Sequence, residues 1–580
     1  MYRLFIEGIE AELNQSADVQ IQKTIIDLSD ISKRGMKFTN AFTLPISNTN
    51  RKIFGYPSRL ASNNRSFERK YSYQLLNSNS ILSTGDAVLK EYDDKKGIKI
   101  QLLEGFDFWS LAGQKKLDDV VNHGDDFLFN NANMDALKLK SSSVFLTALH
   151  TATGNKTDTA LTTYQYTRPC INFRSVLDKI CADVGYSVDY GNVIQFTQLE
   201  DIGSLSNAKD FFISDFKYRF EQFAFSGGLQ IDSGDPVIAP YDSTTLSGDT
   251  LTFNTYKTGI VIKGTITAPN DTTLLIEFSD RTERIAISRG TNFINYRSDS
   301  TDIGNTCQIS CADVCTFDDV YIYSVLREGD VFDIREAIDI SNLYVLGDYN
   351  LPLMTYQAFV KLFCKMFFLD VVADPQTKTL RFYYMAQDID SNNVTDLTDN
   401  IQRNHTVKPG KVYGKLNAFS YANDNDIDSE LGRAYFTTEN ENAPPTKEFI
   451  SISEFSASDE ITASGETIIT ASIYDVAEEK RQSVSDRIVF FADTGAFGFN
   501  AVFSPIAWPR LYSDHYFDLI ENTKRERPET LDVKINSILF SKLQRNPVIY
   551  DGGQESNFLI SSIKKFDEKN LAVLEVVKFG

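Results

Sequence analysis

Hydrophobic residues recur at helical spacing in two stretches of this chain. Residues 355–372 (TYQAFVKLFCKMFFLDVV) place apolar side chains at i, i+3, i+4, i+7, i+8 and i+11, the pattern of an amphipathic helix, with Thr355 as a candidate N-cap. Residues 172–189 (NFRSVLDKICADVGYSVD) repeat this spacing, carry a cysteine at the same place and also run into strand-like residues. We expect two related helix-to-strand units, although unrelated core helices can share this period. The two apolar faces are Phe173, Val176, Leu177, Ile180, Cys181 and Val184, and Tyr356, Phe359, Val360, Phe363, Cys364 and Phe367.

Alternating polar and apolar residues predict strands over much of the rest, with one short helix in residues 106–120. The pattern indicates a multi-domain protein that is mainly β with α additions (α+β). The expected divisions are an N-terminal β-rich unit (1–120), a loop region with the first helix-to-strand unit (121–204), an inserted antiparallel β-sandwich (205–335), the second helix-to-strand unit with further strands (336–450) and a C-terminal β-rich part (451–580).

Length and composition fit a folded protein with several domains. The chain has 580 residues, enough for three or four domains of about 100–200 residues each. Its net charge of −21 predicts an acidic surface, which repels nucleic-acid phosphates and anionic lipids. An acidic wall would also suit a channel through which DNA passes without sticking, but solubility is the simpler explanation of the charge.

The cysteines and the first residues bear on where the chain folds. Six cysteines are too few for a disulfide framework, and Cys170, Cys181 and Cys364 lie in apolar contexts that favour buried free thiols and a reducing cytosol. The opening MYRLFIEGIEAEL has no basic region followed by an apolar one, and no long apolar run occurs. We therefore expect neither export by a classical signal nor a membrane span.

No common catalytic motif occurs in the sequence: P-loop, dinucleotide-binding, nucleophile-elbow and zincin patterns are all missing. The histidines are scattered in polar contexts, away from the cysteines, and we expect surface residues. They are His123, His150, His405 and His515. We therefore predict a protein that is not an enzyme, and assign no catalytic, cofactor-binding or metal-binding residue.

Two stretches have some features of metal sites. Cys307, Cys311 and Cys315 are spaced so that either a strand or a helix brings them towards one face. However, zinc and iron–sulfur sites do not normally use C-x3-C-x3-C, and no fourth ligand is adjacent. Buried thiols or a fortuitous disulfide are the simpler interpretation.

The second stretch is the acidic loop 388–399, which approximates a calcium-binding loop. However, Asn393 stands where such loops have glycine, and Asp399 stands where they have glutamate, so a solvated loop is the simpler interpretation. The candidate ligands are Asp388, Asp390, Asn392, Asp396 and Asp399.

Sugar binding needs exposed aromatic platforms. The two tryptophans, Trp109 and Trp508, lie outside the expected sandwich. Tyrosines within it could serve, although alternating tyrosines in a strand more often pack within the sheet. These are Tyr256, Tyr296, Tyr321 and Tyr323.

Three segments carry a family resemblance. They are residues 23–55 (KTIIDLSDISKRGMKFTNAFTLPISNTNRKIFG), 168–189 (RPCINFRSVLDKICADVGYSVD) and 546–579 (NPVIYDGGQESNFLISSIKKFDEKNLAVLEVVKF). In the first, the matching positions are Phe38, Phe42, Leu44, Pro45, Asn50 and Phe54, and Asn40 replaces the usual basic residue. The segments resemble tail-associated structural proteins of phages and prophages of Bacteroidetes bacteria.

The resemblance implies a virion structural protein, a tail hub or tail-tip (baseplate) component made in the host bacterial cytoplasm. It implies self-association in a ring, as a trimer whose two related β units per chain match a sixfold tail tube. The implied partners are other tail proteins (tube, fibres, spike), with DNA only in passage. One alternative is a receptor- or carbohydrate-binding tail protein that acts through the 205–335 sandwich. A polysaccharide-degrading enzyme with a carboxylate pair is a third reading.

Overall fold

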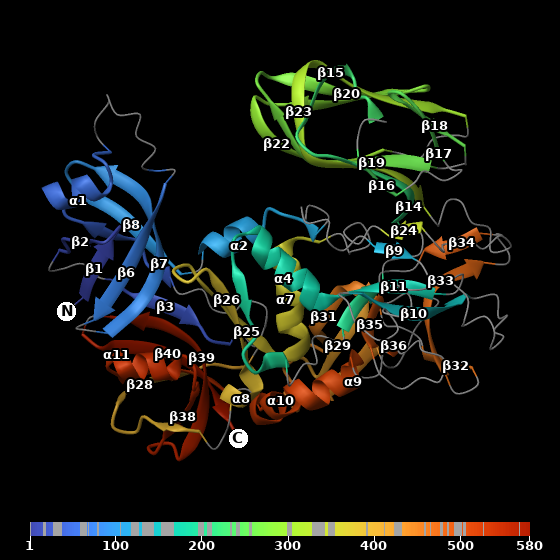
Figure 1. The fold of residues 1–580 in the computed structure, drawn as a ribbon. Helices are drawn as coiled ribbons and strands as arrows, with labels where there is room; N and C mark the ends of the chain where they lie inside the picture. The colour runs from blue at the N-terminus through green and yellow to red at the C-terminus, as the bar shows by residue number, and fades with distance from the viewer. Residues whose placement is uncertain are drawn as a thin grey trace.

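The computed structural model describes residues 2–14, 19–26, 38–57, 67, 69–77, 80–104, 106–117, 127–129, 144–151, 167–194, 202–205, 212–231, 235–238, 244–254, 258–298, 304–327, 343–345, 354–389, 393–410, 412–422, 432–456, 460–463, 466–475, 480–483, 487–491, 501–502, 506–525, 527–567 and 569–580. The described residues form four sheets with short helices, so the prediction of a mainly β chain is confirmed. Among these same residues, no helix has the length and apolar character needed to cross a membrane. In Figure 1 the helices α4 and α7 lie at the centre, between two large sheets, and the sandwich stands above them.

The two ends of the chain form one 14-stranded sheet. The N-terminal strands continue through β3 into the C-terminal strands, because Lys23 and Thr24 pair with Ile563 and Ser562. In β1 (Tyr2–Ile6) and β6 (Lys70–Asn77), buried residues alternate with more exposed ones, as the period of two predicts. The strands are β1 (Tyr2–Ile6), β2 (Ile9–Ala11), β3 (Ile21–Thr24), β4 (Phe38–Thr39), β5 (Phe42–Leu44), β6 (Lys70–Asn77), β7 (Ser80–Asp93), β8 (Gly97–Leu103), β27 (Thr395–Asp396), β28 (Ile401–Val407), β37 (Pro528–Lys534), β38 (Val548–Asp551), β39 (Ser556–Phe566) and β40 (Leu571–Phe579), with helices α1 (Asn48–Ile53) and α11 (Ser537–Leu543) beside them.

Both predicted core helices form. α4 (Phe173–Asp183) begins at Asn172, whose side chain accepts a hydrogen bond from the Ser175 N–H at 3.2 Å. α7 (Tyr356–Phe367) begins at the predicted cap Thr355, which accepts from the Ala358 N–H, also at 3.2 Å. The predicted apolar residues are buried in both helices, and the short helix expected in 106–120 is α2 (Phe106–Ala112).

The two helix-to-strand units pack against each other. The Phe173 ring of α4 lies 5.0 Å from the Phe359 ring and 5.3 Å from the Phe363 ring of α7, measured between centroids. The strands that follow the helices, β12 (Ser187–Asp189), β25 (Leu369–Asp374) and β26 (Thr379–Tyr384), form one three-stranded sheet. The units therefore share one hydrophobic core instead of forming two separate modules.

A partly buried carboxylate joins these two helices. Asp183, at the end of α4, accepts a hydrogen bond from the Tyr356 hydroxyl of α7 at 2.9 Å and pairs with the Lys115 ammonium at 2.6 Å. The tyrosine and the aspartate are 173 residues apart in the sequence. This contact joins α4 to α7, which lie on either side of the inserted strands in the sequence.

An 11-stranded sheet lies on the other side of the helices. Next to it a helical segment runs through a π-helical turn, and Trp508 in this segment is fully buried against Phe419. The strands are β10 (Val144–Thr151), β11 (Thr167–Asn172), β13 (Ile202–Leu205), β29 (Leu416–Ala422), β30 (Arg433–Thr437), β31 (Thr446–Ser456), β32 (Glu460–Ala463), β33 (Glu466–Asp475), β34 (Lys480–Ser483), β35 (Arg487–Phe491) and β36 (Ala501–Val502). The helices are α9 (Trp508–Leu511), η11 (Tyr512–Tyr516), α10 (Phe517–Thr523) and, at the far end of β26, α8 (Met385–Asp388).

The inserted region has its own hydrophobic core, formed by residues between 218 and 322. Its spine is β23 (Thr306–Arg327), which pairs with five other strands. The remaining strands of its sheet are β9 (Phe127–Phe129), β14 (Phe212–Phe220), β15 (Phe223–Gly228), β16 (Asp235–Ile238), β17 (Thr244–Ser247), β18 (Thr250–Phe253), β19 (Thr258–Ala268), β20 (Thr272–Phe278), β21 (Thr282–Ile287), β22 (Gly290–Arg297) and β24 (Leu343–Val345). This core is distinct from the one that surrounds α4 and α7.

Candidate functional site

A groove of about 260 Å³ lies where the two ends of the chain meet. β3 ends at Thr24, and the next two N–H groups, of Ile25 and Ile26, both donate to the Ser561 carbonyl oxygen of β39 at 2.9 Å. The groove thus forms at the seam between an N-terminal and a C-terminal strand. Its lining residues are Thr24, Ile26, Lys408, Val412, Pro528, Glu529, Thr530, Ser561, Ser562, Lys564, Glu575, Val576 and Val577.

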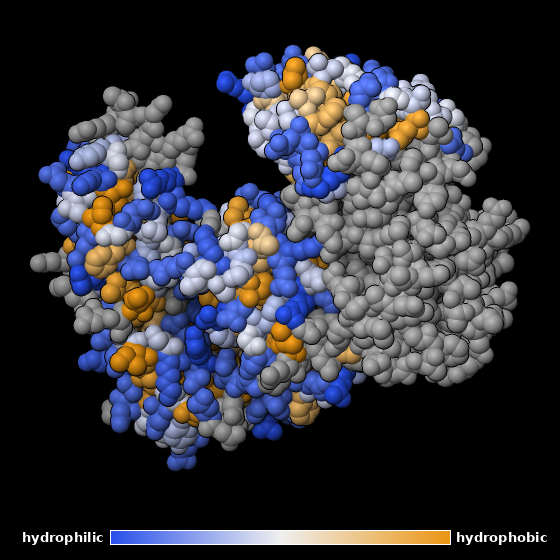
Figure 2. Space-filling model, viewed as in Figure 1, coloured by the Kyte–Doolittle hydropathy of each residue, from blue (hydrophilic) through white to orange (hydrophobic). Residues whose placement is uncertain are grey.

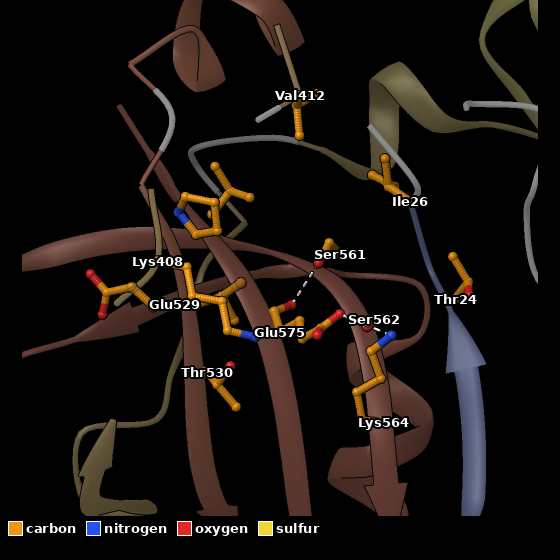
Figure 3. Close-up of a pocket in the computed structure, with 13 residues that line it drawn as sticks. Thr24, Ile26, Lys408, Val412, Glu529, Thr530, Ser561, Ser562, Lys564 and Glu575 are labelled. Atoms are coloured by element: carbon orange, nitrogen blue, oxygen red, sulfur yellow. Dashed lines mark hydrogen bonds and ion pairs between the residues drawn. The ribbon is translucent and has the colours of Figure 1, made fainter. Parts of the chain in front are cut away.

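A small polar network crosses this groove from β39 to β40. The Ser562 hydroxyl donates to the Glu575 carboxylate at 2.8 Å, and the Lys564 ammonium pairs with the same oxygen at 3.1 Å. Figure 3 shows these three side chains turned toward one another on adjacent strands. Because the carboxylate has two donors, it suits cross-linking of the strands more than proton transfer.

Glu529, on β37, is the most buried charged residue of the groove, with 2% of its surface exposed. Its carboxylate pairs with the Arg527 guanidinium at 2.7 Å and accepts from the Gln554 amide at 3.0 Å. A buried carboxylate needs such partners, because desolvation disfavours its charge. Glu529, Lys564 and Glu575 of the groove are thus each held in an ion pair.

Asn50 fixes the segment that carries the family resemblance. Its fully buried amide group donates to the Glu12 and Pro45 carbonyl oxygens at 2.9 and 3.0 Å and accepts from the Glu12 N–H at 3.0 Å. The Ser47 hydroxyl caps α1 by accepting from the Asn50 N–H. Phe42, Leu44 and Phe54 are buried in the same core, so most of the matching positions have a packing role.

A second hollow, of about 250 Å³, is acidic. It lies between β7, β25, α8 and α11, and its three acidic lining residues, Glu104, Asp370 and Asp388, outnumber the two basic ones, Lys23 and Arg545. Burial, assisted by the nearby Asp370 charge and opposed by Arg545, raises the pKa of Asp388 from 3.8 to about 6. Asp388 was considered only as a ligand of the calcium-like loop, and Asp370 belongs to no motif, so nothing in the sequence indicated that the two carboxylates influence each other. The hypothesis of a polysaccharide-degrading enzyme with a carboxylate pair can be tested at Asp388 and Asp370. It requires that the protein hydrolyses an envelope polysaccharide and that Asp388→Asn abolishes this turnover.

Asp388→Asn is expected to stabilise the protein at pH 7–8. The pKa of Asp388 is raised in the folded state, so its stabilising contribution is complete below about pH 4 and is lost as the pH rises through about 6. Asparagine stays neutral, and the gain is about 1 kcal/mol after discounting for partial solvent exposure, seen as a rise of a few degrees in Tm at pH 8 that vanishes near pH 4.

The matched control is Asp396→Asn in the same stretch of chain. Hydrogen bonds from the Thr398 hydroxyl and N–H lower the pKa of Asp396, so removing its charge gives no stabilisation at pH 8. Equal thermal shifts for the two variants at pH 8 would contradict the assignment of Asp388 as a buried, unfavourable charge.

The candidate calcium ligands are divided between different surroundings. Asp388 ends α8 and lines the acidic hollow, whereas Asp396 lies in β27 and is held by Thr398. Asp390 and Asn392 lie outside the described residues. Within the described part of the chain, no group of three or more histidine, cysteine or acidic side chains is arranged to hold a metal ion.

The three cysteines at C-x3-C-x3-C spacing are all free, buried thiols in β23. This agrees with the simpler interpretation of that motif. Cys311 and Cys315 are closer together than an extended strand allows, a feature that the spacing did not indicate.

The expectation of surface histidines is wrong for His515. This residue lies in the π-helical turn and is 7% exposed, with its Nδ1 atom 2.9 Å from the Tyr384 hydroxyl oxygen. Burial lowers the pKa of His515 to about 4, so the ring is neutral at pH 7. The π-turn directs it inward although its sequence neighbours are polar. His123 and the side chains of His150 and His405 lie outside the described residues.

The aromatic candidates for sugar stacking have packing roles where they are described. Trp508 is fully buried and Trp109 packs against the main core. Tyr296 packs against the sandwich core, and Tyr321 lies beneath the Arg219 guanidinium, 5.6 Å from the ring centroid. Tyr256 and the side chain of Tyr323 lie outside the described residues.

Large hydrophobic side chains are exposed beside the acidic hollow. Ile538 of α11 is 71% exposed and Ile81 of β7 is 56% exposed, and these two elements pack against each other. Figure 2 shows hydrophobic surface in the region of α11 and of the N-terminal sheet above it. Apolar groups gathered in this way are typical of contacts between proteins.

Comparisons with known proteins give limited information. Neither a protein-family model nor a curated protein sequence matches this chain. Among solved structures, the chain is similar to a 43 kDa tail protein of prophage MuSo2 from Shewanella oneidensis, with 9% identity, a TM-score of 0.33 and 99% and 98% of the two chains covered. About a fifth of the chain is similar to murine APRIL (9% identity, TM-score 0.16, 19% and 98% covered) and to PRD1 vertex protein P5 (8% identity, TM-score 0.15, 20% and 96% covered). TM-scores this low carry no argument about the function of this chain.

Proposed function

We propose that this chain is a structural component of a phage tail, of the hub or tail-tip type. One observation supports the proposal: the three segments that resemble tail-associated proteins, far apart in sequence, meet in one folded unit. Lys23 and Thr24, the first two residues of segment 23–55, pair with β39 of segment 546–579, and α4 of segment 168–189 lies in the same hydrophobic core. Chance matches at separate places in a chain have no reason to pack together.

In this proposal the chain assembles as a trimeric ring in the host bacterial cytoplasm. The ring then becomes part of the virion tail. The two helix-to-strand units around α4 and α7, which share one core, are the related units that would let a threefold ring meet a sixfold tail tube. Residues 1–120, 121–204, 336–450 and 451–580 make up the hub, and the sandwich of 205–335 is a peripheral module for fibres, a spike or a host surface. The acidic inner wall lets DNA pass.

The ring is tested on the purified full chain by light scattering and negative-stain microscopy. A discrete threefold annulus is expected, and a double variant, Ile81→Glu with Ile538→Glu, should weaken its association at least tenfold, because burying an isoleucine contributes about 2 kcal/mol. Val314→Glu, an equally exposed apolar position of the sandwich, is the matched control and should leave the ring intact. A wild-type monomer at high concentration contradicts the proposal.

The alternative is a receptor- or carbohydrate-binding tail protein acting through the sandwich. It is favoured by the sandwich's separate core and by Phe293, which is 40% exposed on β22. Glycan-array binding of the full chain that Phe293→Ser abolishes and Phe517→Ser preserves would support it. Absence of any such binding, together with an annulus, would support the structural role alone.

A further inference from the structure

The spine of the sandwich, β23, turns a corner at two cysteines. Up to Cys311 the strand pairs with β20, and from Thr316 onwards it pairs with β19. On its other side, β15 advances two residues, from Phe225 to Gly227, while β23 covers the four-residue step between Cys315 and Cys311. The extra residues form a bulge, which is how a strand bends from one sheet partner to the next.

The bulge brings two thiols together beneath the surface. The Sγ atoms of Cys311 and Cys315 lie 2.9 Å apart, within about 1 Å of the disulfide bonding distance of ~2.05 Å. Both cysteines are buried, whereas the three residues between them are exposed, Val314 by 54%. A small solute therefore has to pass only the bulge itself to reach the sulfurs.

We propose that Cys311 and Cys315 are an oxidation site, at which a peroxide converts the two thiols into an intrastrand disulfide that closes the corner of β23. One thiolate attacks hydrogen peroxide, giving a sulfenic acid and, after protonation, one water. The sulfur of the second thiol then attacks the sulfenic sulfur, so that the S–S bond forms as the S–O bond breaks and a second water leaves. Two thiols and one peroxide thus give one disulfide and two waters.

The burial of the thiols and the redox state of the surrounding medium together determine when the disulfide forms. Burial raises the pKa of the Cys315 thiol to about 12, so little thiolate exists at pH 7 and the reaction is slow in a reducing cytosol and at neutral pH. The disulfide forms when the protein enters an oxidising medium, where such bonds persist. It then fixes the bulge between β15, β19 and β20, at the point where the strand changes partner.

The test is made on the reduced full chain, treated with hydrogen peroxide at pH 8.5 (about the usual thiol pKa), quenched, unfolded, alkylated with iodoacetamide and digested with trypsin. Cys307, Cys311 and Cys315 all fall in one tryptic peptide, Ser298 to Arg327, so a single mass reports on all three. Before oxidation every cysteine in it is alkylated. After oxidation we expect the peptide to carry one alkyl group instead of three and to lack the two hydrogen atoms of the thiols that formed the disulfide. Fragmentation should locate the remaining alkyl group on Cys307.

Cys307 is the matched control, because it is equally buried on the same strand but pairs in register with Leu251 and Phe278. Cys307→Ser should leave the disulfide unchanged, and Cys311→Ser should abolish it. The proposal is overturned if all three cysteines stay alkylated after peroxide treatment. Oxidation only to sulfinic or sulfonic acids, or a disulfide that includes Cys307, would overturn it as well.

Discussion

Phe173→Ala is expected to lower the free energy of unfolding by about 4 kcal/mol. The Phe173 ring is fully buried and meets three other rings, of Phe359, Phe363 and Phe455, at centroid distances of 5.0, 5.3 and 5.7 Å. Its removal leaves a cavity between α4, α7 and β31 that these aromatic neighbours cannot fill without leaving their own positions. Urea unfolding followed by circular dichroism measures the loss.

Two variants calibrate this result. Phe517→Ala makes the same chemical change at a side chain that is 47% exposed, and should cost about 1 kcal/mol or less. Phe173→Leu keeps most of the buried volume and should cost about 1–1.5 kcal/mol. If Phe173→Ala were no more damaging than Phe517→Ala, the two helices could not share the core described above.

Asn50→Ala is expected to destabilise the N-terminal sheet by about 3 kcal/mol, with a fall in Tm of roughly 5–10 °C. The substitution removes three part-buried hydrogen bonds and leaves the Glu12 N–H and the Glu12 and Pro45 carbonyl groups without these partners, next to the one face of α1 that is buried. Backbone groups buried without partners cost more than the bonds themselves contribute. Differential scanning calorimetry is the direct measurement.

Asn48→Ala is the matched control, since it makes the same substitution two residues earlier in α1, at an exposed side chain. A change of no more than about 0.5 kcal/mol is expected there. Equal melting temperatures for the two variants would show that the asparagine clamp does not hold residues 38–57 in place.

The comparison of sequence with structure is clearest for the two core helices. The spacing of their apolar residues predicted both helices, the Thr355 cap and the buried faces, because a helix of period 3.6 places such residues on one side. The spacing could not show that the helices pack on each other, since many partner helices accept the same apolar face. The Tyr356–Asp183 hydrogen bond, across 173 residues, depends on where the chain returns after the sandwich.

For the polar residues of the candidate sites, too, the sequence did not indicate which distant residues they contact. The C-x3-C-x3-C motif correctly indicated buried thiols, but the bulge that joins Cys311 to Cys315 comes from pairing with three other strands. His515 was expected on the surface and is buried, because the π-turn rotates it toward Tyr384. Asp388 was considered as part of a loop, whereas its raised pKa follows from burial and from Asp370, which lies on a different strand.

The sequence by itself determined the class of this protein: mainly β, with two amphipathic helices and a separate inserted block of strands. These features are local, since the period of apolar residues and the turn and cap residues act within a few positions of the chain. The tertiary structure alone decided that the first and last strands share a sheet, and that two chain ends form the groove near Thr24 and Ser561. Strand pairing and burial join residues hundreds of positions apart, and a local pattern contains no information on which distant partner completes it.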